Sequence, residues 1–406
     1  MQLNSSVWDI FNATLVFLAG ILIAIQLAKS FNVPQRRSVI IYFWHTIFCF
    51  AYVQYVIAYG GDAIGYYEAA LYLNIDYSFG TNAVRLLVYF LFSVFGLSFL
   101  ASFLVFNIIG FIGLLAFDGS LRAATWGKSI NIRRFATLLV FMPSVSFWSS
   151  AIGKDAISFM ATGLALWAAL DFRRRKLIMI VAVIVMLVVR PHMAGLMVIA
   201  ICVSMVLQTK VSFAQRTLVG GMALASAAWL VPFALNYSGL GSTDVAINLA
   251  AYVEKRQGYN QEGGGGIDIS GMSLPMQLFT YLFQPLPFEA TDLFSLAASL
   301  DNVVLLVLVV LGGLEMLKRR KNAMRVTSEN RVFLWVYLLS ASLLLAVTTA
   351  NLGIAVRQKW MFAPMLIFLF VSVIGRPRQH VAEQHPTVLD RGHVQTSFDL
   401  NRKQKR

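Results

Sequence analysis

Long apolar runs alternate with short polar segments along most of the chain. Because about 20 apolar residues match the thickness of the hydrocarbon core of a bilayer, each such run predicts a transmembrane helix. We predict about eleven of them, at 9–28, 38–59, 97–117, 135–150, 156–170, 177–190, 193–208, 217–235, 302–317, 332–350 and 360–375. The pattern therefore predicts an all-α, polytopic integral membrane protein, with residues 1–375 forming a single transmembrane domain.

Two segments depart from this pattern. Residues 84–96, AVRLLVYFLFSVF, are apolar but too short and too close to the next run to count as a span. We predict an interfacial or re-entrant helix there. Residues 376–406 are polar and rich in charge, which predicts a disordered tail.

Lysine and arginine orient the predicted helices. In a strictly alternating topology, all but seven of the 33 basic residues fall on one side. Since Lys and Arg accumulate in cytoplasmic loops, this predicts an outside N-terminus and a cytoplasmic C-terminus. The seven exceptions, which would face outward, are Arg85, Lys154, Arg190, Lys255, Arg256, Arg357 and Lys359. Each is an exception to this bias, so each is a candidate for a functional role at its own position rather than for a role in setting the topology.

Most of the irregular sequence lies on the same predicted outer side. Residues 60–85 form one outer loop and residues 236–301 form the largest. The second contains four consecutive glycines at 263–266, a composition typical of a hinge or a lid tip. It ends in QPLPFEATDLFSLAASLD, which we expect to be partly helical and interfacial.

Composition excludes most soluble classes. The chain is 58% hydrophobic and 13% charged, whereas soluble domains are nearer 25% charged. The net charge of +14 is attributed to topology rather than to nucleic-acid binding. Cys49 and Cys202 both lie in apolar runs and are interpreted as packing residues, not as a disulfide or a metal site.

The first outer loop begins with GGDAIGYYEAA. If this segment is helical, Asp62 and Tyr66 share one face. A carboxylate beside aromatic rings suits a general base that activates a sugar hydroxyl, with the rings stacking on the sugar. The alternative is that Asp62 caps the helix.

A tight turn, FWSSAIGKDAISF, joins two predicted spans and brings Trp148, Lys154 and Asp155 together. Lys154 is a candidate for binding a phosphate that arrives with a lipid carrier. Asp155 would orient Lys154 or cap the following helix. The alternative is an interfacial Trp beside a Lys that extends to the membrane surface.

The segment VVRPHMAG lies between two apolar runs. Pro191 predicts a helix break, and Arg190 and His192 are predicted to lie below the membrane surface. An ionisable residue at that depth is costly and therefore a site hypothesis. Arg190 is expected to pair with a carboxylate or to bind phosphate, and His192 is expected to orient it.

The last predicted span begins in NLGIAVRQKWMFAP. Arg357 and Lys359 are candidates for an anion clamp there, with an interfacial anchor as the alternative. Arg256, next to Lys255 in VEKRQGYN, is a further candidate for substrate binding; an exposed charged face explains that pair equally well.

No cofactor is predicted. Acidic residues on the predicted outer side would be able to supply oxygen ligands to a divalent cation, but they lack a dedicated spacing. These residues are Asp62, Glu68, Asp76 and Asp155.

Taken in order, GGDAIGYY, PSVSFWSSAIGKD, RPH, QPLPFEA, LAASLD and NLGIAVRQKWMFAP resemble motifs in membrane proteins of bacterial exopolysaccharide and O-antigen clusters. These include the Wzy-type repeat-unit polymerases and the GT-C-like membrane glycosyltransferases. The resemblance covers roughly residues 55–370. The chain lacks the paired-acid motif of the second group and the arginine-repeat loop pair of the first, so it leaves the choice between them open.

The resemblance implies a glycosyltransferase of the bacterial inner (plasma) membrane that uses a polyprenyl-(di)phosphate-linked donor on the outer face. It implies Asp62 as the base and Arg190, Arg256 and Arg357 as the arginines that such polymerases use. The implied partners are the polyprenyl-linked glycan and a chain-length regulator or flippase of the same pathway. We expect polymerisation of surface polysaccharide repeat units; the alternative is a transporter of lipid-linked glycans.

Overall fold

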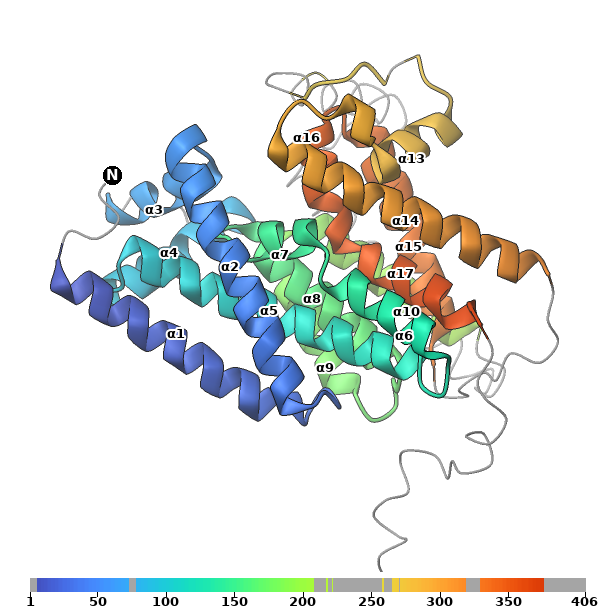
Figure 1. Cartoon of the computed structure of the whole chain (residues 1–406), viewed down its shortest axis with the longest axis horizontal. Helices are drawn as coiled ribbons and strands as arrows, with labels where there is room; N and C mark the ends of the chain where they lie inside the picture. The colour runs from blue at the N-terminus through green and yellow to red at the C-terminus, as the bar shows by residue number, and fades with distance from the viewer. Residues whose placement is uncertain are drawn as a thin grey trace, which may run out of the picture.

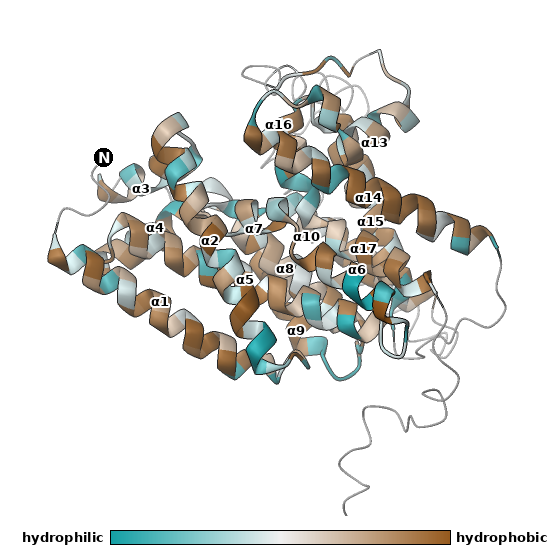
Figure 2. Ribbon diagram, in the orientation of Figure 1, coloured by the Kyte–Doolittle hydropathy of each residue, from teal (hydrophilic) through white to brown (hydrophobic). Residues whose placement is uncertain are grey.

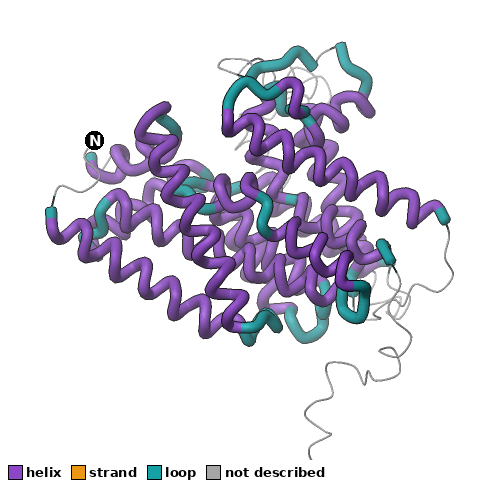
Figure 3. Tube along the Cα trace, viewed as in Figure 1, coloured by secondary structure: helices purple, strands orange, loops and turns teal. Residues whose placement is uncertain are grey.

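Helices joined by short loops make up the described part of the chain (Figure 3). The computed structural model describes residues 6–72, 78–207, 265–269, 271–318 and 329–375, with three isolated positions at 217, 221 and 258. Within those ranges no residue belongs to a β-strand, and a single isolated bridge pairs Gly266 with Asn351.

The first half of the chain contains ten helices in the described ranges: α1 (Val7–Ala28), α2 (Gln35–Tyr59), α3 (Asp62–Leu71), α4 (Thr81–Phe95), α5 (Phe99–Ala124), α6 (Ile130–Val140), α7 (Pro143–Ser149), α8 (Lys154–Ala169), α9 (Lys176–Val189) and α10 (Pro191–Val206). The second half contains α13 (Leu274–Phe283), η1 (Pro287–Glu289), α14 (Leu293–Leu317), α15 (Arg331–Thr348), α16 (Leu352–Gln358), η2 (Lys359–Met361) and α17 (Ala363–Val373).

In the described part of the chain, five helices are long and apolar enough to cross a membrane: α1, α2, α5, α14 and α15. The segment from Leu352 to Val373 gives a sixth if its two parts, bent by 64° at Phe362, form one span. The assignment as a membrane protein is thus supported, whereas eleven spans and the orientation stay predictions. Apart from the isolated positions 217 and 221, the predicted span 217–235 lies outside the described residues.

Several predicted spans differ from the helices observed. Residues 135–150 form two helices, α6 and α7, because Pro143 starts a helix readily but cannot continue one. The spans predicted at 156–170, 177–190 and 193–208 are helices of 16, 14 and 16 residues, shorter than a full crossing.

The observed bounds of α4 and α14 also differ from the predicted ones. The separate helix expected at 84–96 is present as α4 and ends at Gly96, which is in the left-handed conformation. The predicted interfacial stretch before residue 302 is continuous with the following span, because α14 begins at Leu293, where Asp292 caps it.

The peripheral helices α1 and α14 consist largely of hydrophobic residues (Figure 2). On α1, Phe11, Leu15, Leu18 and Leu22 follow one another at helical spacing and are each about half exposed. A row of this kind is unfavourable in water and favourable against lipid, which agrees with a membrane location.

Helix α5 lies at the centre of the helical bundle, with α1 and α2 on one side and α8 on the other (Figure 1). It approaches α8 closely through glycines: a side chain at Gly163 of α8 would overlap the backbone of Gly113 of α5. Small residues let membrane helices pack at short range, where van der Waals contact drives their association.

Polar contacts define one end of the bundle. Lys128, in the loop between α5 and α6, donates to the carbonyl oxygens of Val371, Ser372 and Ile374 at 2.8–2.9 Å and so caps the end of α17. Ala169, at the end of α8, accepts from the backbone of Asn330, just before α15. The opposite end of α8 carries the residues of the candidate site.

The glycine contact gives a direct test of this packing. Gly163→Ala places a methyl group against the α5 backbone, so it should lower the melting temperature of the detergent-solubilised protein. The matched control is Gly313→Ala, also inside a helix but with open space around it. Because alanine favours the helix by about 1 kcal/mol over glycine, the control should be neutral or slightly stabilising. Equal effects of the two substitutions would contradict the packing described.

Candidate functional site

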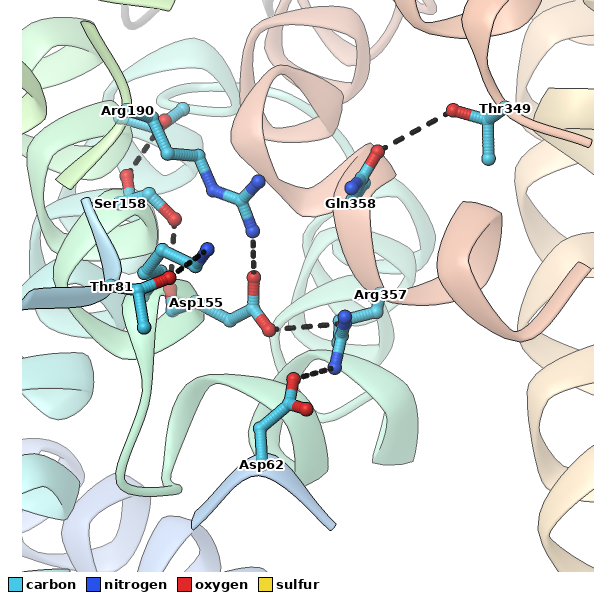
Figure 4. A network of polar contacts seen from close by, with 10 residues as sticks. Asp62, Thr81, Asp155, Ser158, Arg190, Thr349, Arg357 and Gln358 are labelled. Atoms are coloured by element: carbon cyan, nitrogen blue, oxygen red, sulfur yellow. Dashed lines mark hydrogen bonds and ion pairs between the residues drawn. The ribbon is translucent and has the colours of Figure 1, made fainter. Parts of the chain in front are cut away.

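Five charged residues meet where α3, α8, α16 and the junction between α9 and α10 come together (Figure 4). They are Asp62, Lys154, Asp155, Arg190 and Arg357, and we refer to them as the charge cluster. All five were singled out from the sequence, and the structure brings them together from four separate segments.

Asp155 is the centre of the charge cluster. One carboxylate oxygen, Oδ1, accepts from Arg190 Nη2 at 2.6 Å. The other, Oδ2, lies 3.3 Å from Arg357 Nε. Arg357 also donates through Nη1 to Asp62 Oδ2, at 3.2 Å. The four charges therefore alternate in sign along one chain of contacts.

Exposure increases along that chain. The side chains of Arg190 and Asp155 are 8% and 18% exposed, that of Arg357 is 25% exposed and that of Asp62 is 60% exposed. Arg190 and Asp155 thus form the floor of the site and Asp62 its rim. A ligand that approaches from solvent meets Asp62 and Arg357 first.

The break at Pro191 places Arg190, as the sequence predicts. Arg190 lies between α9 and α10, outside helical geometry. Its backbone N–H donates to the carbonyl of Met186, and its own carbonyl accepts from Met193 and Ala194. The interruption therefore leaves its backbone groups satisfied while its side chain turns toward Asp155.

The two carboxylates do not act as helix caps. Asp62 and Asp155 follow Gly61 and Gly153, the N-cap positions of α3 and α8, and neither helix has a side-chain cap. Each carboxylate binds an arginine instead. The capping alternative for both residues is therefore not what the structure contains.

Lys154 adds a third cation. Its ammonium donates to Thr81 Oγ1 at 3.1 Å, so the structure gives it a hydroxyl partner rather than the expected carboxylate of Asp155. Burial, together with the positive charge of Arg190, lowers the pKa of Lys154 to about 8. The charge cluster then contains three cations and two carboxylates, a net positive site.

Aromatic side chains line the approach to the charge cluster. The guanidinium carbon of Arg357 lies 6.0 Å from the ring centre of Trp148. Tyr66 is buried, which raises the pKa of its phenol to about 12, so it remains a hydroxyl donor. From Trp148 the aromatic contacts continue to Tyr52, with ring centres 5.7 Å apart.

A tyrosine row on α2 extends this wall outward and was not identified from the sequence. Tyr52, Tyr55 and Tyr59 succeed one another at ring-centre distances of 5.9 and 5.2 Å, and Phe294 of α14 packs on Tyr55 at 4.8 Å. Tyr59 is 73% exposed. The three tyrosines are spaced three and four residues apart, which places them on one helix face, but they lie within the span predicted at 38–59 and were not singled out there.

Lys359 is separated from Arg357, which corrects the expectation of a shared anion clamp. Its side chain is buried and donates to Asn302 Oδ1 and to the carbonyl of Leu282, with Asp301 as an electrostatic partner. Residues two apart on a helical turn point in different directions, so the pair cannot grip one ligand. Asp301 was missed because its position was assigned to a loop.

Two other expected site residues remain untested. His192 is half-buried in the first turn of α10, two residues after Arg190. Arg256 and Lys255 lie outside the described residues.

The two carboxylates leave little room for a metal between them, because the guanidinium of Arg357 contacts both. No group of three or more His, Cys, Asp or Glu side chains suited to a metal ion occurs in the described ranges. With three cations against two carboxylates, the arrangement is electrostatically suited to an anion.

No family model, curated protein or solved structure matches the chain.

The charge cluster predicts unequal costs for removing its two carboxylates. Asp155→Asn leaves the buried Arg190 without its counter-charge, which should cost about 3–5 kcal/mol of stability. Asp62→Asn removes an exposed pairing and should cost less than about 1 kcal/mol. Thermal unfolding of both variants in the same detergent measures the difference. An Asp155→Asn protein that unfolds at the wild-type temperature would contradict the central place given to Asp155.

Proposed function

We propose that the chain is a glycosyltransferase of the bacterial inner membrane that takes its donor from a polyprenyl (di)phosphate on the outer face. Among such reactions we favour the polymerisation of surface polysaccharide repeat units. The observation that carries the proposal is the convergence of Arg190, Arg357 and Lys154 with Asp62 in one partly open, net positive site.

The cations fit the leaving group of such a transfer. When the bond between the anomeric carbon and the phosphate oxygen breaks, the electron pair leaves with the diphosphate. Fixed cations in a site sheltered from water stabilise that developing charge strongly. Arg357 and Lys154 are the two cations best placed to bind it: Arg357 is the more exposed arginine, at 25% against 8% for Arg190, and Lys154 pairs with a hydroxyl.

Asp62 fits the role of general base. Its side chain is 60% exposed, and within the described residues it contacts Arg357. A diphosphate that binds Arg357 competes with this contact and frees the carboxylate. Asp62 then accepts the proton of an acceptor hydroxyl, whose oxygen attacks the anomeric carbon.

The aromatic wall fits a glycan path. Sugar rings stack on aromatic side chains through their C–H faces, and the row from Trp148 to the exposed Tyr59 leads from the charge cluster to the surface. An acceptor chain that lies along this row would present its terminal hydroxyl to Asp62.

The alternative is a transporter of lipid-linked glycans. The specific observation in its favour is Lys359, an ionisable side chain that is buried inside the bundle beside Asn302 and Asp301. Charged groups at such depth are typical of transport pathways.

Surface-glycan profiles test the proposal. In a deletion strain, the wild-type gene should restore long glycan chains, whereas Arg357→Gln should lower their yield about 100-fold, the usual cost of one lost transition-state contact. Arg173→Gln is the matched control, an exposed arginine at the other end of α8.

The species that accumulates distinguishes the possibilities. Loss of long chains with single repeats retained indicates a polymerase, and loss of one sugar from every repeat indicates a single-sugar transferase. Complete repeats that accumulate on the lipid carrier and never reach the outer face would indicate the transporter instead. Wild-type chain length and yield in Arg357→Gln would defeat the proposal.

A further inference from the structure

A second basic site lies at the opposite end of the bundle from the charge cluster. Arg37 lies in the first turn of α2 and Tyr59 ends that helix. At 1.5 Å of rise per residue they stand roughly 33 Å apart along the helix. Next to Arg37, the end of α5 and the start of α6 enclose a cavity of about 370 Å³.

Four arginines line this cavity: Arg37, Arg122, Arg133 and Arg134. The one carboxylate in its lining is Asp118, which is committed to Arg37 through contacts of 2.6–3.0 Å. Asp118 also acts on Arg122 through its charge, so the lining holds four arginines against one carboxylate. The Nε of Arg122 is buried and has no hydrogen-bond partner in the described part of the chain.

The rim of the cavity is apolar and exposed. Trp126 and Ile130, both in the lining, are 58% and 52% exposed, and Leu138 on the same helix as Ile130 is 51% exposed. Tryptophan beside exposed aliphatic side chains is typical of the membrane interface. A pocket with a cationic interior and an apolar rim matches an amphiphile with an anionic head group. A free inorganic anion would contact only the interior and leave the apolar rim without a ligand.

We propose that this cavity, which we call the arginine pocket, binds the phosphate-bearing head group of an anionic lipid. Arg122 and Arg134 would hold the phosphate oxygens, and Trp126 and Ile130 would contact the start of the acyl chains. Basic pockets between membrane helices bind lipid head groups in this way. The inference does not depend on the proposed function, because the arginine pocket lies at the opposite end of α2 from the tyrosine row and uses none of the residues of the charge cluster.

Lipid titrations of the full-length protein test the inference. In neutral detergent, native mass spectrometry compares binding of phosphatidylglycerol, phosphatidylcholine and inorganic phosphate. Phosphatidylglycerol should bind best. Arg133→Gln/Arg134→Gln should weaken it about tenfold or more, since each arginine near a lipid surface contributes on the order of 1 kcal/mol.

The matched control is Arg173→Gln/Arg174→Gln, which removes the same charge from two exposed arginines of the loop between α8 and α9. It should leave binding unchanged. Both replaced pairs are exposed, so a loss of folding is not expected, and equal melting temperatures check this. Arg122→Gln, which alters the interior of the pocket, should weaken binding as well.

Three outcomes would overturn the inference. An equal decline in both double variants would mean diffuse attraction to positive charge. No decline in Arg133→Gln/Arg134→Gln would mean that the lipid binds elsewhere. Displacement of phosphatidylglycerol by inorganic phosphate at equal concentration would assign the pocket to a free anion rather than to a lipid.

Discussion

The bridge that Asp155 makes between two arginines holds the site together. Arg190 comes from the break between α9 and α10 and Arg357 from the end of α16, and each takes one oxygen of the same carboxylate at the start of α8. An unpaired charge in a partly buried site is energetically costly, so both arginines are held against the carboxylate of Asp155. The positions of three distant segments are thus set by one side chain.

That bridge also determines what remains available to a ligand. Asp155 neutralises about one of the two arginine charges, Lys154 is held by a hydroxyl, and the exposed Asp62 contacts Arg357 from the rim. The result is a site with a fixed, buried ion pair in its interior and an outer contact, between Asp62 and Arg357, that an incoming anion is able to displace. Preorganised cations with a displaceable carboxylate suit a reaction in which an anion departs as a proton is taken up.

Much of this arrangement follows from the sequence, because charges are rare in so apolar a chain. Charged residues interrupt apolar sequence at each position of the charge cluster. Burying Asp155 and Arg190 separately would be far costlier than burying them as a pair. The helix break at Pro191 is also predictable from the sequence, since proline lacks the N–H that a helix interior needs.

The rest depends on geometry that local patterns do not contain. Lys359 turns away from Arg357 because helical rotation separates residues two apart, and its partner Asn302 is 57 positions distant in the chain. The arginine pocket likewise needs α2, α5 and α6 to converge. In the sequence its arginines read only as part of a general excess of positive charge.

The affinity of the protein for the lipid carrier without its sugar is the sharpest test of whether the charge cluster binds a diphosphate. A polyprenyl diphosphate and the corresponding polyprenyl alcohol share their apolar chain and differ only in the anion, so titration of the purified protein with each isolates the contribution of the cations. We predict that the wild-type protein binds the diphosphate at least about tenfold more tightly than the alcohol, and that Arg357→Gln removes most of this preference. Equal affinity for the two compounds in the wild-type protein would contradict it.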